Sequence, residues 1–195
     1  MRLTSLLLLA PLALAAFGFP ATAPQQTSPA SPAHVWRESP KSDTARGTAY
    51  NRYTLTGKFL RAPEHGGDIS NRPALVVDCK PGKETRNGKG RFAAASLLIG
   101  TTLKIEYVEP QEIHGTSYYP KVSVRYRVND TKDENEKWAP GADKASASVP
   151  KEWLKKILLA QTVDLTVSDD SGAPIVMKFD MPDPKPVQEV CNVHE

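Results

Sequence analysis

Alternating apolar and polar residues mark several stretches of the chain as strands. In residues 122–128 (VSVRYRV), valine or tyrosine alternates with serine or arginine, which predicts a half-buried strand with one apolar face. On 101–108 the same pattern places Leu103, Ile105 and Tyr107 on one face. Alternation or short apolar runs predict further strands at 53–59, 74–79, 91–99, 145–149, 163–167 and 175–181. Many short strands between turns indicate a mostly β, sandwich-like domain.

One segment has the period of a helix instead. After Pro150, which suits a first helical turn, four large apolar residues recur at three- and four-residue spacing: Trp153, Leu154, Ile157 and Leu158. We therefore expect one short amphipathic helix. Turn signals are expected at Pro81-Gly82, at Asn87-Gly88 and at residues 168–172 (SDDSG), the last joining two strands as a hairpin. A short helical turn is expected at 184–191.

Two consecutive segments at the N-terminus differ in composition from the rest of the chain. Residues 1–23 combine Arg2, an apolar run and small residues at Ala21 and Ala23, which predicts a secretory signal peptide. Cleavage after Ala15 or Gly18 is an alternative, because Pro24 suits the first position of a product poorly, and an uncleaved anchor helix is another. Residues 24–49 are rich in Pro, Ser and Ala, which predicts a flexible linker before a single domain over 50–195. Trp36 interrupts the linker and either docks on the domain or binds a partner.

The two cysteines, Cys79 and Cys191, allow one pairing. In an exported chain an even cysteine count favours a disulfide, and this one would close a loop of more than a hundred residues. Such a loop corresponds to about 4–5 kcal/mol in the chain-entropy model. The alternatives are a metal pair, which needs more ligands with local spacing, and a catalytic thiol, which needs a base. Together with the signal peptide, the pair predicts a periplasmic or secreted protein.

Charge excludes one large class of partner. The formal net charge is only +3, and the basic residues from Lys80 to Arg91 are interleaved with glycine and asparagine, as in a solvated loop. We therefore expect no nucleic acid as partner. No second long apolar run follows the signal peptide, so we expect no transmembrane segment after its cleavage.

The order of features resembles a known family. An apolar strand ends in Cys79, a strand reads Val122-Ser123-Val124-Arg125-Tyr126-Arg127-Val128-Asn129-Asp130, Trp138 and the Pro150 helix follow, and the chain ends soon after Cys191. This pattern resembles the type VI secretion-associated TagO/VasI-like family over about residues 53–193. The resemblance implies an exported β domain with an accessory role in the bacterial cell envelope, and it gives no known catalytic residues to carry over.

The polar residues do not form a recognisable catalytic or metal-binding set. The four histidines, His34, His65, His114 and His194, lie in the predicted linker, loops and tail without the spacing of metal ligands. The acidic stretch from Asp130 to Glu136 lacks the glycine of a calcium loop, and Asp169-Asp170 fits turn chemistry. We therefore expect no catalytic residues, no metal site and no cofactor.

Aromatic residues in or near loops give the one candidate surface. Tyr118, Tyr119 and Trp138 are candidates for contact with a protein partner, with the alternative that Trp138 fills the core. The sequence thus favours a non-catalytic exported binding domain. Two alternatives remain: an extracellular hydrolase or hydrolase inhibitor that uses the 109–119 loop, with Glu112 near His114, and a small-ligand carrier with an apolar cavity between its sheets.

Overall fold

The computed structural model describes residues 35–44, 47–64, 72–85, 88–108 and 118–191. These residues form eleven strands and two short helices, so the predicted mostly β class is confirmed. The strands are β1 (Arg37–Asp43), β2 (Thr48–Thr56), β3 (Lys58–Arg61), β4 (Ala74–Thr85), β5 (Gly88–Leu98), β6 (Glu106–Val108), β7 (Tyr119–Val128), β8 (Glu134–Pro140), β9 (Ser146–Val149), β10 (Thr162–Ser168) and β11 (Pro174–Asp180). The helices are α1 (Lys151–Leu158) and α2 (Lys185–Cys191). The predicted signal peptide lies outside the described residues.

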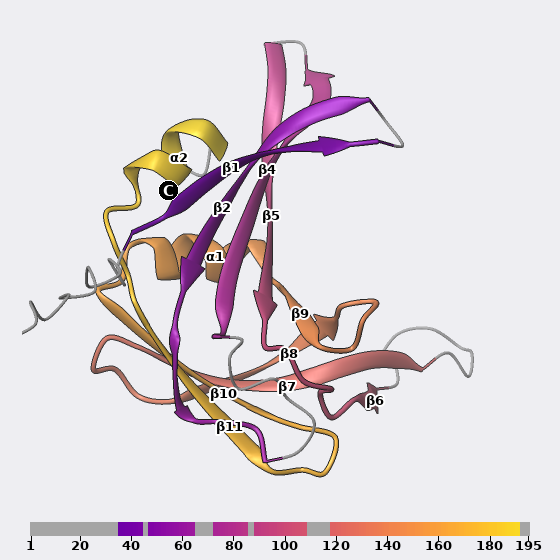
Figure 1. Cartoon of the computed structure of the whole chain (residues 1–195), viewed down its shortest axis with the longest axis vertical. Helices are drawn as coiled ribbons and strands as arrows, with labels where there is room; N and C mark the ends of the chain where they lie inside the picture. The colour runs from indigo at the N-terminus through magenta and orange to yellow at the C-terminus, as the bar shows by residue number, and fades with distance from the viewer. Residues whose placement is uncertain (1–34, 45–46, 65–71, 86–87, 109–117, 192–195) are drawn as a thin grey trace, which may run out of the picture. The chain divides into compact units, whose positions relative to one another are not determined.

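All the described strands belong to one antiparallel sheet that bends into two layers. Its order is β1-β2-β4-β5-β9-β8-β7-β10-β11-β3, and β6 pairs with β7 beside this path. In Figure 1, β1, β2, β4 and β5 run crosswise to β7, β10 and β11. Strands that pass from one layer to the other form the corners of such an arrangement. Here β2 continues directly into β3, and β8 pairs with β7 on one side and β9 on the other.

A glycine makes the β2–β3 corner possible. Gly57 donates its N–H to the carbonyl of Pro73, at 2.8 Å. A Cβ at this position would lie 2.7 Å from Cε1 of Phe179 and 2.9 Å from the carbonyl oxygen of Lys178. Because these distances are shorter than any real contact, only glycine lets the chain pass this close to β11.

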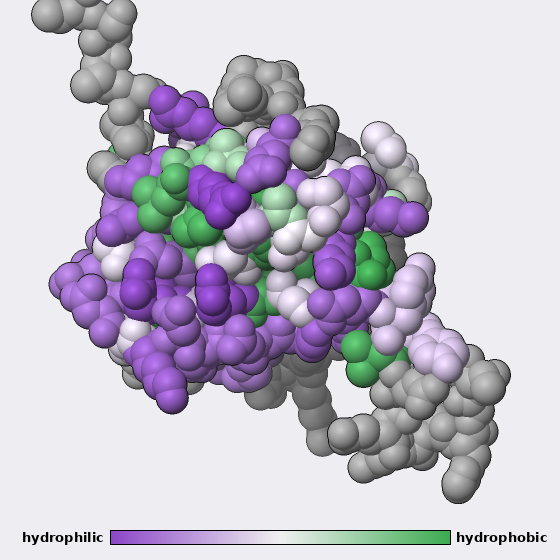
Figure 2. Space-filling model, turned by 90° about the horizontal axis from the view of Figure 1, so that it is seen from below, coloured by the Kyte–Doolittle hydropathy of each residue, from purple (hydrophilic) through white to green (hydrophobic). Residues whose placement is uncertain are grey.

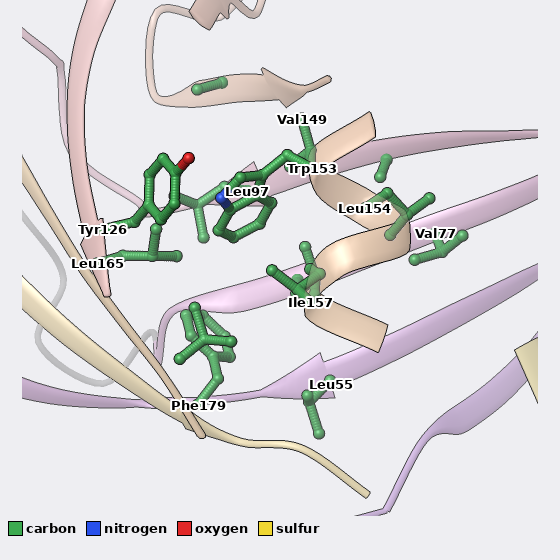
Figure 3. Packing of buried hydrophobic residues seen from close by; sticks show 14 of the residues in the cluster. Leu55, Val77, Leu97, Tyr126, Val149, Trp153, Leu154, Ile157, Leu165 and Phe179 are labelled. Atoms are coloured by element: carbon green, nitrogen blue, oxygen red, sulfur yellow. The ribbon is translucent and has the colours of Figure 1, made fainter. Parts of the chain in front are cut away.

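Helix α1 fills the space between the layers. It follows Pro150 as predicted, and Trp153, Leu154, Ile157 and Leu158 are each at most 3% exposed. Figure 3 shows Trp153 pointing towards Tyr126 and Leu154 lying close to Val77. Burying an aliphatic or aromatic side chain of this size contributes roughly 1.5–3 kcal/mol. The helix is therefore part of the core, and its lysines lie on the opposite side.

The predicted flexible linker over 24–49 is wrong for its second part. Residues 37–43 form β1, which pairs with β2 over its whole length, and β2 begins at Thr48. Trp36 is 7% exposed and belongs to the core cluster, so it docks on the domain. The composition of residues 37–43 does not predict β1, because an edge strand is held by backbone hydrogen bonds and needs few apolar side chains. Its charged residues and Pro40 are typical of edges that resist further pairing.

Two other predicted boundaries differ from the structure. The turn predicted at Pro81-Gly82 is wrong, because β4 continues to Thr85 with a register shift between Pro81 and Glu84. An irregularity of this kind tolerates the missing N–H of proline within a sheet. The strand predicted over 101–108 is shorter, since only Glu106–Val108 forms β6, and Leu103 makes an isolated bridge to Asp169.

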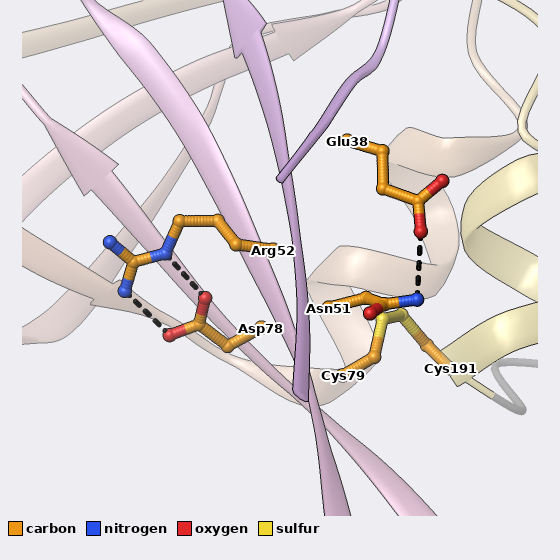
Figure 4. Close-up of a disulfide and its surroundings, with 6 residues drawn as sticks. All are labelled: Glu38, Asn51, Arg52, Asp78, Cys79 and Cys191. Carbon is orange, nitrogen blue, oxygen red and sulfur yellow. Dashed lines mark hydrogen bonds and ion pairs between the residues drawn. A yellow bond between two sulfur atoms is a disulfide. The ribbon is translucent and has the colours of Figure 1, made fainter. Parts of the chain in front are cut away.

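A disulfide between Cys79 and Cys191 joins β4 to α2, as predicted. The two Cα atoms lie 4.7 Å apart, 112 residues apart in sequence, and both cysteines are buried. Figure 4 shows the bridge beside β2, where the amide of Asn51 donates to Glu38 of β1 at 2.7 Å. On the outer side of the same strands, the guanidinium of Arg52 binds Asp78 through two hydrogen bonds of 2.7 and 2.9 Å. This end of the sheet is therefore fixed covalently and by polar contacts.

The two helices are both short. In the part of the chain that the structure describes, neither is long and apolar enough to cross a membrane.

Candidate partner-binding surface

A two-stranded ribbon extends from the sheet at the start of β7. Strand β6 pairs with this part of β7 alone, with Glu106 opposite Lys121, Tyr107 opposite Pro120 and Val108 opposite Tyr119. The neighbouring β8 pairs with β7 only from Val122 onwards. We call residues 106–108 and 118–121 the tyrosine ribbon. Figure 1 shows it leaving the rest of the sheet on the right.

The tyrosine ribbon exposes large apolar side chains on both faces. Tyr107 is 67% exposed, Tyr118 54%, Tyr119 48% and Val108 40%. Since side chains alternate along a strand, Tyr118 and Pro120 continue the face that carries the buried Val122 and Val124. Tyr107, opposite Pro120, shares that face, while Val108 and Tyr119 lie on the other. Among the described residues, no other element pairs with the ribbon or packs on this end of the core-facing side of the sheet.

A polar cluster fixes the base of the tyrosine ribbon to β8. The hydroxyl of Ser123 donates to Glu106 at 2.9 Å, and the ammonium of Lys137 contacts both side chains. Lys137 and Ser123 lower the pKa of Glu106 below its usual range. The three residues belong to the adjacent strands β6, β7 and β8, so the cluster links the ribbon to the rest of the sheet.

Of the three predicted surface residues, Tyr118 and Tyr119 are exposed and Trp138 is not. Trp138 is 1% exposed, and its ring packs edge-on against Trp153 with the centroids 4.7 Å apart. Its indole N–H donates to Glu136 at 2.9 Å. The prediction that Trp138 lies on the binding surface is therefore wrong, and the alternative that it fills the core is confirmed. Sequence reasoning missed Tyr107, which it had placed on the same face as the buried Leu103.

The side chains around Trp138 form a network at the edge of the core. The hydroxyl of Tyr126 lies 2.7 Å from Glu134 and 2.9 Å from Glu136, and Lys156 donates to Glu134 at 2.7 Å. Burial, together with the two carboxylates, raises the pKa of Tyr126 well above its usual value. Hydrogen bonds from Lys156 and Tyr126 lower the pKa of Glu134. Two residues of the acidic stretch 130–136 therefore lie in β8 and position an aromatic core.

The other residues considered for chemistry have structural roles or lie outside the described residues. Asp169 closes the β10–β11 hairpin by accepting from the Ser171 hydroxyl at 2.6 Å and the Ala173 N–H at 2.9 Å, which confirms its turn role. These bonds lower the pKa of its carboxyl. All four histidines and Glu112 lie outside the described residues. Among the residues that are described, no three His, Cys, Asp or Glu side chains are grouped to hold a metal ion.

The outer face of β7, β10 and β11 differs from the tyrosine ribbon in its charge. Arg127 binds Asp164 at 2.7 Å, and Arg125 lies 3.8 Å from Asp133. Figure 2, which views the molecule from below, shows a largely hydrophilic face with hydrophobic areas between the charged side chains. Because these charges are paired with one another, this face is a weaker candidate for binding than the ribbon.

No protein-family model, curated protein or solved structure matches this chain. The resemblance to the TagO/VasI-like family therefore stays a prediction from the residues.

Proposed function

We propose that the chain is a non-catalytic exported binding domain of the bacterial cell envelope, which holds a protein partner through the tyrosine ribbon. The observation that carries this proposal is the group of three exposed tyrosines, Tyr107, Tyr118 and Tyr119, on a ribbon that no other described layer covers. Aromatic residues are enriched at protein interfaces, and tyrosine is among the residues that dominate their binding energy.

The base of the tyrosine ribbon also favours binding. Glu106, Ser123 and Lys137 fix its orientation before a partner arrives, so little conformational entropy is lost on association. Each tyrosine offers a large apolar ring and a hydroxyl for hydrogen bonding.

Two further observations support an extracytoplasmic binding role. The disulfide fits an oxidising compartment, in agreement with the signal peptide predicted from the sequence. The space between the two layers is occupied by α1 and by Trp138, Trp153 and Phe179, which favours an external surface over the interior as the binding site. An accessory role in type VI secretion, which the family resemblance implies, belongs to the same proposal.

The test is affinity capture of the exported chain from a native envelope extract, with mass spectrometry of the recovered proteins. The variant carries Tyr107→Ser, Tyr118→Ser and Tyr119→Ser. The matched control is Leu159→Ser, which changes an apolar side chain that is 55% exposed directly after α1. We expect a partner that is recovered with the wild type and the control but lost with the triple variant. Equal recovery by all three proteins would show that the ribbon is not the binding surface.

A further inference from the structure

A second apolar surface lies where β4 begins and β5 ends. Ala74, the first residue of β4, pairs with Leu98, the last residue of β5. The turn before β9 lies against them, because Ile99 donates its N–H to the carbonyl of Ala145 at 3.1 Å. These segments line an open groove of about 300 Å³, which we call the Leu98 groove.

The Leu98 groove combines an apolar wall with two charged residues. Ala74, Leu98, Ile99 and Ala145 supply the apolar lining, and Leu98 is 39% exposed. Arg72 and Asp143 are the two charged residues of the lining. Within the described part of the chain, no carboxylate forms an ion pair with Arg72.

Asp143 is held in a fixed position. Its Oδ1 accepts from the N–H of Ala145 at 3.0 Å and from the hydroxyl of Ser146 at 2.7 Å. These bonds all use Oδ1, which leaves Oδ2 as an acceptor for an N–H group of a ligand. The groove therefore offers a cation for an anionic group, an acceptor for an amide and an apolar wall for a side chain.

We propose that the Leu98 groove binds the C-terminal residue of a peptide or protein when that residue is apolar. The α-carboxylate pairs with Arg72, whose planar guanidinium matches a carboxylate through two parallel hydrogen bonds. The side chain of the residue packs on Leu98 and Ala74, and its backbone N–H donates to Asp143. Capture of a terminal carboxylate beside a side-chain pocket is a recurring mode of peptide recognition.

The size of the groove favours a single residue over a larger ligand. Sites for drug-sized molecules occupy roughly 300–1,000 Å³, and this groove lies at the lower limit. A long acyl chain would leave most of its methylene groups in water. The site is separate from the tyrosine ribbon in its residues and its chemistry, so either surface can fail its test without the other.

The experiment titrates the purified exported chain with N-acetyl-Gly-Gly-Leu, as free acid and as C-terminal amide, followed by amide NMR shifts. We expect shifts at Leu98, Ile99 and Ala145, and about tenfold weaker binding of the amide, because it lacks the carboxylate. Arg72→Gln should weaken the free acid by the same factor and leave the amide unchanged. Arg125→Gln, which removes an exposed arginine on β7, is the matched control and should change neither.

Three results would overturn the proposal. They are equal affinity for acid and amide, shifts that map away from the groove, and binding of octanoate at the groove without binding of the peptide. Leu98→Ser keeps the test valid if Arg72→Gln does not fold, since it should weaken acid and amide alike. Because neither variant touches the tyrosine ribbon, capture of its partner should persist in both.

Discussion

The first three residues of β7, Tyr119–Lys121, and the remaining seven, Val122–Val128, lie on one strand but have opposite surroundings. From Val122 to Val128, the inward side chains are at most 7% exposed, because α1 and the facing layer cover them. From Tyr119 to Lys121, the strand continues without such a cover, and its neighbours Tyr107 and Tyr118 are more than half exposed. Alternation therefore determines which side chains share a face, whereas the rest of the fold determines whether that face is buried. We propose that this exposed part is where a protein partner binds.

The largest effect expected from this comparison is at Trp138, opposite Val122 in the covered half. Trp138→Ala removes a buried ring from the contact with Trp153 and leaves a cavity, so we expect a loss of about 3–5 kcal/mol in the free energy of unfolding. Denaturant unfolding measures it. A loss below about 1 kcal/mol would mean that Trp138 is not part of a packed core.

Removing the disulfide should lower the stability of the interior without changing the conformation of the tyrosine ribbon. Replacing Cys79 and Cys191 by alanine removes the bridge between β4 and α2, and we expect a loss of about 2–5 kcal/mol. The NMR shifts of Tyr107 and Tyr119 should stay unchanged under native conditions, because the ribbon lies outside the covered interior. Shifts at these tyrosines as large as those near α2 would contradict the separation.

Acid should weaken the base of the tyrosine ribbon. The folded-state pKa of Glu106 is lowered, so its contribution to stability is present above the ordinary glutamate pKa of about 4.3 and is lost as pH falls through the folded value. Glu106→Gln should therefore reduce the loss of stability between pH 5 and pH 3, which thermal unfolding at a series of pH values measures. Identical pH profiles of variant and wild type would show that the carboxylate does not hold the ribbon.

The smallest effect is expected at Tyr119. Its side chain is about half exposed, so Tyr119→Ser should change the free energy of unfolding by less than about 0.5 kcal/mol while weakening partner capture. The same denaturant experiment as for Trp138 applies. A destabilisation comparable with that of Trp138→Ala would place Tyr119 in the core.

Local signals in the sequence predicted the parts of the fold that depend on neighbouring residues. The alternation of β7, the apolar stripe of α1 and the turn residues around Asp169 each specify an element within a few residues of chain. The cysteine pair was predictable because two cysteines allow one bridge. The bend at Gly57 was not, since the reason for a glycine there is the close approach of Phe179, far away in sequence.

The candidate site was predictable in part for the same reason. Tyr118 and Tyr119 were predicted within the 109–119 loop, which favours exposure, and they are exposed, although Tyr119 is the first residue of β7. Trp138, predicted at the surface, is buried because α1 covers its strand, whereas Tyr107, predicted on the face of the buried Leu103, is exposed because its strand extends beyond the layers formed by the described residues. Strand β1 was missed because its pairing with β2 is a long-range contact that its polar composition does not indicate.

The most direct test of the account is site-specific photo-crosslinking of the exported chain in intact cells. A photoreactive residue replaces Tyr119 in one variant and, in a second, Leu159, which is similarly exposed directly after α1. The account predicts a discrete crosslinked protein at position 119, absent at position 159 and lost when Tyr107 and Tyr118 are changed to serine. The same crosslinked products at both positions, or none at position 119, would contradict the tyrosine ribbon as the binding surface.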